Sequence, residues 1–177
     1  MTDRPGRPLV PAPRDDLQVL QAVKAPAHFY RYLFNTVGEP WLWTDRRTES
    51  DQNLAAILAS PALRLMVLYA AGVPAGFIEL RRIDKRETNI DYFGLMPEFI
   101  GQGLGPYLLD FGIGLAWQEG ATKLTVNTCT LDHPRALRGY QRAGFIPVRR
   151  RDYEKDDPRL TGIIPRHTAP HIPIAAP

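Results

Sequence analysis

One stretch decides the fold of this 177-residue chain, and it runs Leu95-Met96-Pro97-Glu98-Phe99-Ile100-Gly101-Gln102-Gly103-Leu104-Gly105-Pro106. Its three glycines stand at alternate positions, where the absence of a Cβ lets the backbone turn tightly. Such a turn directs successive backbone N–H groups inward, and the start of a following helix adds partial positive charge. The stretch therefore predicts a site for phosphate groups, unless it is only a glycine-rich connection without a ligand.

The segment after this turn has the clearest helical periodicity in the sequence. Between residues 103 and 119, apolar side chains recur at i, i+4, i+7 and i+11, at Leu104, Leu108, Phe111 and Leu115. Pro106 suits the first turn, where a missing N–H costs little. The glycine spacing differs from the Gly-x-Gly-x-x-Gly of dinucleotide folds, and no Gly-Lys-Ser/Thr follows, so a different phosphate-bearing ligand is expected.

Outward from this helix, the apolar pattern predicts the remaining elements. We expect further helices over residues 27–37, 51–59 and 134–143, and strands over residues 17–23, 64–69, 75–82, 88–94, 123–128 and 145–153. Gly112 and Gly114 lie inside the main helix, where close packing on the sheet explains them. This order of elements predicts an α/β protein of the α+β type, with helices packed on a mixed sheet.

Length and composition indicate one globular domain, since 44% of the residues are hydrophobic and 23% are charged. We expect a flexible N-terminal arm over residues 1–14, the domain over 15–155, and a Pro-rich C-terminal tail or strap over 156–177. The longest apolar run, residues 65–78, is too short to span a membrane. The N-terminus lacks the apolar segment of a secretory signal. A cytoplasmic location without a membrane partner is therefore expected.

Charge and side-chain chemistry argue against several other kinds of site. The net charge of +3 is mild, and the basic run at residues 149–151 is short and followed by acidic residues, so no nucleic-acid partner is expected. The four histidines show no metal-ligand spacing with Cys129, so no metal is expected. Cys129 is the single cysteine and stands inside an apparent strand that continues the run over residues 123–128, which favours a buried, inert thiol.

Two separated motifs resemble those of the GNAT acetyltransferases. Residues 100–105 match the glycine positions of the family's acetyl-CoA loop, Arg/Gln-x-x-Gly-x-Gly/Ala, with Ile100 at the Arg/Gln position. Residues 133–145 are similar to the family's Asn-x-x-Ala, Tyr and Gly-Phe pattern, with His133 at the Asn position. The resemblance covers about residues 90–145. It implies a mostly antiparallel, twisted sheet with helices on both faces, and acetyl-CoA as co-substrate.

The resemblance also implies which residues hold the cofactor. The predicted cofactor-binding residues are those of the loop and of the second motif's start, namely Leu95, Met96, Ile100, Gly101, Gln102, Gly103, Leu104, Gly105, Pro106 and His133. Backbone amides make most of such a pyrophosphate site, so Ile100 at the Arg/Gln position removes only a side chain. His133 has an alternative role as a cap of the short helix that follows it.

Acetyl transfer to an amine needs a neutral amine, a polarised carbonyl and a protonated leaving thiol. The resemblance places Tyr140 where the family's phenol lies near the cofactor sulfur, which predicts a general acid. Glu79 and Asp91 interrupt apolar strands and are the candidates for a general base, acting directly or through water. A solvated strand face explains either carboxylate equally well.

The acceptor is expected to be a primary amine of a small molecule or peptide, with the protein a monomer or homodimer. In proteins similar to this one the aromatic segment near residue 41 forms a wall of the acceptor cleft, which makes Tyr30 and Trp41 candidate substrate-binding residues beside Asn127. Core packing is the alternative for the two aromatic residues. The alternative function is a non-catalytic acyl-CoA-binding regulatory module, which the substitutions at Ile100 and His133 favour.

Overall fold

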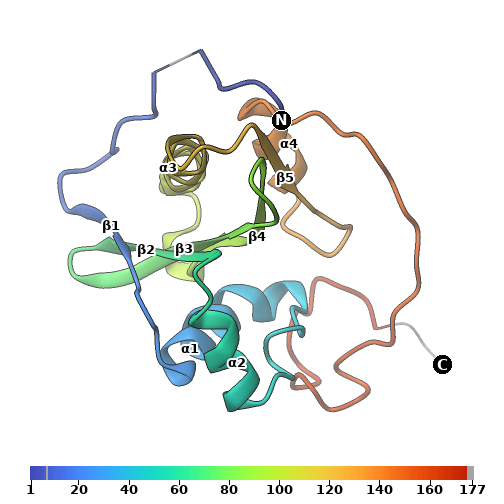
Figure 1. Ribbon diagram of the computed structural model, residues 1–177. Helices are drawn as coiled ribbons and strands as arrows, with labels where there is room; N and C mark the ends of the chain where they lie inside the picture. The colour runs from blue at the N-terminus through green and yellow to red at the C-terminus, as the bar shows by residue number, and fades with distance from the viewer. Residues whose placement is uncertain (7, 175–177) are drawn as a thin grey trace.

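The computed structural model describes residues 1–6 and 8–174, and it places a five-stranded sheet between two layers of helices (Figure 1). The strands are β1 (Leu17–Gln21), β2 (Leu63–Ala70), β3 (Val73–Arg82), β4 (Glu87–Leu95) and β5 (Lys123–Val126), and they lie side by side in that order. The first four pair antiparallel, and β4 pairs parallel with β5. The predicted mixed, mostly antiparallel sheet is confirmed.

Four α-helices cover the two faces of this sheet: α1 (Ala27–Gly38), α2 (Asp51–Leu58), α3 (Leu104–Gln118) and α4 (Ala136–Arg142). Short 3-10 turns at Glu39–Trp41 and Pro97–Phe99 follow α1 and β4. Helices α1 and α2 lie on one face of the sheet, whereas α3 and α4 lie on the other (Figure 1).

A two-residue turn joins β2 to β3. Ala71 and Gly72 both have positive φ, 48° and 83°, and Ala70 pairs with Val73. Two positive φ values are the signature of a type I′ turn, whose twist matches that of the flanking strands. The strands predicted over residues 64–69 and 75–82 therefore pair as an antiparallel hairpin, and its turn fixes which side chains of β2 and β3 face α3.

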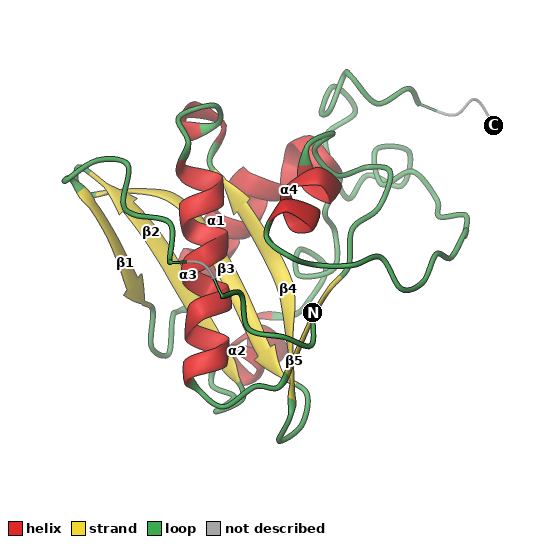
Figure 2. Cartoon of the chain, turned by 90° about the horizontal axis from the view of Figure 1, so that it is seen from above, coloured by secondary structure: helices red, strands yellow, loops and turns green. Residues whose placement is uncertain are grey.

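Each face of the sheet carries its own core. On the α3 side, Leu68, Ile78 and Leu80 pack with Leu104 and Leu108, all of them fully or almost fully buried. Figure 2 shows α3 lying along this face, with β1 and β2 to one side of it and β4 and β5 to the other. The opposite core joins α1 and α2 to the other faces of the same strands.

The glycines of α3 allow close packing. A Cβ on Gly112 would lie 2.5 Å from Cδ1 of Ile78 in β3, so this glycine lets the helix approach the sheet as the sequence predicts. Gly114 faces another neighbour, because its Cβ would lie 3.1 Å from the side chain of Leu9 in the N-terminal arm.

A bulge in β4 separates it from β5. Glu79 pairs with Tyr92 and Leu80 pairs with Ile90, so Asp91 is an extra residue in β4. The parallel pairing with β5 ends at Ile90 and Val126, immediately before this bulge. Bulges bend a strand and increase its twist. The second half of β4 therefore has no strand beside it on the β5 side among the described residues.

Two sequence expectations near the end of the domain are wrong. Residues 145–153 form no strand, and Ile146 and Val148 are 75% and 91% exposed. The β5 edge is already bonded at Leu124, whose N–H and carbonyl pair with the carbonyl and N-terminal amine of Met1 at 2.8 Å each. Cys129 lies exposed in a turn after β5 rather than in a buried strand, because its N–H donates to the Asp132 carboxylate.

The two terminal segments pack on opposite layers of the fold (Figure 1). The Val10 N–H donates to Asp110 of α3, and Leu9 contacts the same helix. In the C-terminal segment, Arg159 is 4% exposed and donates to the carbonyls of Thr168, Ala169 and Ile172. Residue 7 of the predicted arm and residues 175–177 of the predicted tail lie outside the described residues. No helix in the described part is long and apolar enough to cross a membrane.

Candidate active site

The turn before α3 is built as the glycine spacing predicts. Gly101 and Gly103 have φ of 88° and 78°, in the left-handed region that favours glycine. A Cβ at either position would meet no atom within 4 Å, so backbone conformation rather than space requires glycine there. Gly103 is the N-cap of α3, and no side chain caps this helix end.

The backbone N–H groups of this turn have no partner within the described chain. The N–H of Ile100 donates to the Pro97 carbonyl, but no described acceptor receives the N–H groups of residues 101–105. Unbonded N–H groups at a helix N-terminus are an anion site, since the helix dipole adds to their partial charge. The turn is exposed, apart from the buried side chain of Leu104, so these donors are accessible to a diphosphate.

One residue that the sequence did not single out holds this turn. Arg14 donates from Nη1 to the Gln102 side-chain oxygen at 3.0 Å, and its other nitrogens bind Asp16. Gln102 in turn donates to the Glu98 carbonyl at 2.8 Å. Arg14 and Gln102 are polar, lie far apart in the sequence and follow no apolar repeat. Only the folded structure, which places the N-terminal arm beside the loop, therefore identifies Arg14.

The other predicted cofactor residues divide into two groups. Leu95 lies half-buried at the end of β4, with its Cδ1 3.9 Å from the Cβ position of Gly105. Met96 is 2% exposed, its N–H donates to the Ala75 carbonyl and its carbonyl accepts from Phe99. Met96 has no free backbone group for a ligand, so its placement supports a role in positioning the turn rather than in cofactor contact.

His133 lies in the segment that enters α4. Its Nδ1 accepts the N–H of Arg135, the N-cap residue of α4, at 3.0 Å, but no side chain caps this helix end, so the alternative role of His133 as a helix cap is not observed. Burial and the nearby Arg135 lower the pKa of this imidazole. The Trp41 ring lies 5.1 Å from the His133 ring and 5.2 Å from that of His171 in the C-terminal segment. Trp41, which is expected at the wall of the acceptor cleft, therefore contacts both the second motif and the C-terminal segment.

Tyr140 lies in α4, on the α3 side of the sheet. It is 8% exposed and packs against Phe93 of β4 and Phe145. Burial, with a smaller contribution from Asp132, raises the pKa of this phenol. The hydroxyl therefore keeps its proton at neutral pH, as a general acid requires.

Glu79 lies on the opposite face, at the centre of a buried polar network. Its side chain is fully buried, and its oxygens accept from the Tyr30 hydroxyl at 2.5 Å and from Arg46 Nη2 at 2.8 Å. Burial raises the pKa of Glu79, and Arg46 and Tyr30 oppose that shift. Tyr30 is also fully buried, so it does not lie at the wall of the acceptor cleft as expected. It can affect an acceptor only through its hydrogen bond to Glu79.

Asp91, the extra residue of the bulge, lies where β4 and β5 separate. Arg81 binds it through Nε at 2.5 Å and Nη2 at 3.0 Å, and Asn89 donates to it at 2.6 Å. Arg46 Nη2 is 3.9 Å away. The bulge places Asp91 and Tyr92 on the same side of β4, facing the segment before α2.

Asp91 and Asn127 line the same hollow, of about 610 Å³, on the α1–α2 face of the sheet. The structure therefore brings one predicted base and one predicted substrate-binding residue together at the strand opening. The pairing of Glu79 with Arg46 also orients a guanidinium toward this hollow. Among the described residues, no three His, Cys, Asp or Glu side chains gather in a way that suits a metal ion.

These features fit the parts of an acyl-CoA. The free N–H groups before α3 suit a diphosphate, and the gap beside the second half of β4 leaves strand backbone for an amide-bearing arm. Tyr140 and Asp91 lie on the two faces of the sheet at this gap.

Residues 28–145 match the acetyltransferase (GNAT) family. Among solved structures, an aminoglycoside acetyltransferase from an uncultured soil metagenomic sample is similar with a TM-score of 0.63 and 13% identity, covering 80% of this chain and 97% of that one. A ribosomal-protein-alanine N-acetyltransferase from Brucella melitensis biovar Abortus 2308 gives 0.60 at 16% identity, covering 78% and 98%.

An aminoglycoside N-acetyltransferase, AAC(6')-Iy, in complex with CoA gives a TM-score of 0.60 at 18% identity, covering 81% of this chain and 97% of that one. At these identities the solved structures show a shared fold. No curated protein matches the sequence of this chain.

Proposed function

This chain belongs to the acetyltransferase (GNAT) family, and we propose that it transfers the acetyl group of acetyl-CoA to a primary amine of a small molecule or peptide. The observation that carries this proposal is the turn at residues 101–105, whose N–H groups have no acceptor within the described chain and open directly onto α3. Members of the family use acetyl-CoA as the acetyl donor, and it supplies the activated thioester when bound.

Tyr140 is the proton donor of this proposal. Its raised pKa keeps the phenol protonated, and its hydroxyl has no hydrogen-bond partner among the described residues. The Tyr140 O–H therefore holds the proton that the leaving sulfur requires.

Asp91 is the proposed base. Glu79 is fully buried and bonded to Tyr30 and Arg46, so it has no contact with an acceptor. The Asp91 side chain is 8% exposed at the hollow and accepts the amine proton through a water molecule. We assign Glu79 to positioning Arg46 and Asp91 to proton acceptance.

Two measurements test the proposal. Calorimetry is expected to detect acetyl-CoA and CoA binding, and a thiol reagent is expected to detect CoA release when an amine acceptor is added. Tyr140→Phe is expected to slow thiol release while leaving CoA affinity within about twofold, because the phenol contributes to the transition state rather than to binding. Binding without thiol release from any amine would instead support the non-catalytic acyl-CoA-binding module.

A further inference from the structure

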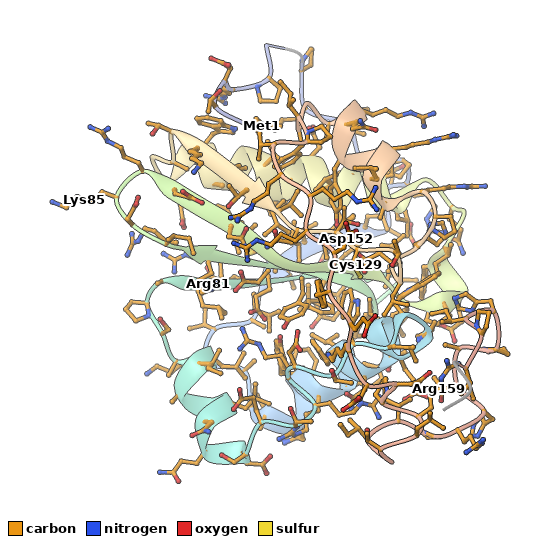
Figure 3. The ribbon with its side chains drawn as sticks, turned by 90° about the vertical axis from the view of Figure 1, so that its right-hand side faces the viewer. Met1, Arg81, Lys85, Cys129, Asp152 and Arg159 are labelled. Carbon is orange, nitrogen blue, oxygen red and sulfur yellow. The ribbon has the colours of Figure 1, made fainter. Side chains whose placement is uncertain are left out.

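The hollow on the α1–α2 face is lined by charged and amide side chains of both polarities. The segment before α2 contributes Asp45 and Arg46, β3 contributes Arg81, and the strand opening contributes Asn89, Asp91 and Asn127. Arg81 lies on the α2 side of the molecule, away from the C-terminal segment that holds Arg159 (Figure 3). Its guanidinium side chain is 48% exposed and therefore accessible from the hollow.

The hydrogen-bond acceptors of this hollow are already used within the protein. Both Asp91 oxygens receive donors, one from Asn89 and Arg81 and the other from Arg81 alone. Asp45 accepts from the Tyr92 hydroxyl at 3.3 Å and lies 3.7 Å from Lys155. For a ligand amine or a bridging water, the carboxylates of the hollow therefore keep one further acceptor site on Asp91 Oδ2 and the exposed part of Asp45.

The donors are in excess. Arg46 uses only Nη2, toward Glu79, and its Nε is buried without a partner. Within residues 1–6 and 8–174, no side chain or carbonyl accepts from Nη1 of Arg46, Nη1 of Arg81 or the Asn127 amide. Unpaired N–H groups at a partly buried site favour a ligand that brings anionic oxygen atoms.

The Arg46 guanidinium is held firmly in this position. Glu79 forms an ion pair with it, and the centre of the Tyr92 ring lies 5.4 Å from the Arg46 Cζ. The Arg46 side chain is only 15% exposed, so a carboxylate bonded to it would be largely shielded from water. A planar guanidinium in such a setting matches the two oxygens of a carboxylate.

The same charges disfavour a polycation. Each further ammonium group of a polycation would meet the two guanidinium groups of the hollow and bring no acceptor for their free N–H groups. A molecule with one amine and one carboxylate has a favourable partner for each group. Its carboxylate meets the free nitrogens of Arg46 and Arg81, and its amine faces Asp91 and the opening between β4 and β5.

We propose that the acceptor is a small amino acid, and that Arg46 and Arg81 select it by binding its carboxylate. This inference rests on the proposed acetyltransferase function. In the transfer, the amine nitrogen forms a bond to the acetyl carbon and the carbon–sulfur bond breaks. The amine proton passes to Asp91 through water, and the leaving thiolate takes the proton of Tyr140. Glu79 acts as a positioning residue for Arg46.

The first test compares matched acceptors on the unmodified protein. Initial rates of thiol release are measured with a panel of α-amino acids, with the amide of each, and with polyamines and an aminoglycoside. We expect kcat/KM for the best amino acid to exceed that for its amide by about tenfold to a hundredfold, because the amide leaves the guanidinium groups without a charged partner. Equal rates for acid and amide, or a preference for polycations, overturn the inference and leave the acetyltransferase proposal intact.

The second test uses variants. Arg81→Gln and Arg46→Gln are expected to raise KM for the amino acid more than for its amide, and so to bring the acid-to-amide ratio toward one. Arg82→Gln is the matched control, because Arg82 is exposed on the same strand and does not line the hollow. If Arg46→Gln fails to fold, Arg81→Gln carries the test alone. A ratio unchanged by Arg81→Gln contradicts the selection, whereas no turnover with any amine refutes the proposed function itself.

Discussion

Substitution of Gly103 tests whether the turn before α3 binds phosphate, because the loss of CoA affinity can be measured apart from the loss of stability that backbone strain causes. Gly103 has φ of 78° and open space at its Cβ position, so alanine there meets a conformational cost and no clash. The left-handed conformation costs a non-glycine residue about 1–2 kcal/mol. For a domain of this size that loss lowers Tm by about 2–8 °C. The chain either accepts this strain or relaxes the turn and moves its N–H groups.

Relaxation of the turn weakens cofactor binding. Each N–H that no longer reaches a phosphate oxygen removes a charge-assisted hydrogen bond of about 1.5–3 kcal/mol, which is about tenfold to a hundredfold in Kd. Titration calorimetry with CoA is therefore expected to give a Kd for Gly103→Ala at least about tenfold above that of the unmodified protein. Thermal unfolding of the same sample measures the stability loss.

Gly120 supplies the control at the other end of α3. Its φ is 91° and its Cβ position is also open, so Gly120→Ala is expected to lose a similar Tm while binding CoA normally. The reasoning is refuted when the two variants lose similar stability and bind CoA with the same Kd. That result would show that the turn before α3 does not hold the diphosphate.

Three further predictions concern the remaining parts of the site and fold. Tyr140→Phe is expected to lower kcat by about a hundredfold. Because burial raises the pKa of this phenol, the ratio of the wild-type kcat to the variant kcat should stay constant from about pH 7 to 10. A ratio that already decreases within this pH range contradicts the assignment. Arg46→Met is expected to lower the free energy of unfolding by about 3–5 kcal/mol, because Glu79 is left buried without its countercharge. In urea denaturation, the double variant Arg46→Met with Glu79→Gln should recover most of this loss. No recovery argues against the ion pair as the cause of the loss. Gly112→Ala brings a Cβ within 2.5 Å of Ile78 Cδ1 and is expected to cost about 1–3 kcal/mol of stability. In thermal unfolding, this cost should be smaller in an Ile78→Val background, which lacks that methyl group. Equal costs in both backgrounds would exclude this contact as the cause of the loss.

Much of the fold follows from short-range patterns. The α3 periodicity and the apolar runs of β2, β3 and β4 each depend on neighbours in sequence, and the structure has all of these elements. The strand predicted at residues 145–153 has the same kind of pattern and does not form. Strand pairing needs a free edge, and Met1 bonds Leu124 on the edge of β5.

The sequence by itself determined the turn at residues 101–105 and the helix that follows, because glycine conformation and helical periodicity are properties of a few consecutive residues. Tertiary structure alone decided which carboxylate is buried and which faces the hollow. The bulge at Asp91 and the bonds from Glu79 to Tyr30 and Arg46, across 49 and 33 residues, arise only when β3, β4 and α1 pack together. Burial and charge pairing are set by such distant contacts, and therefore so is the chemistry expected of each carboxylate.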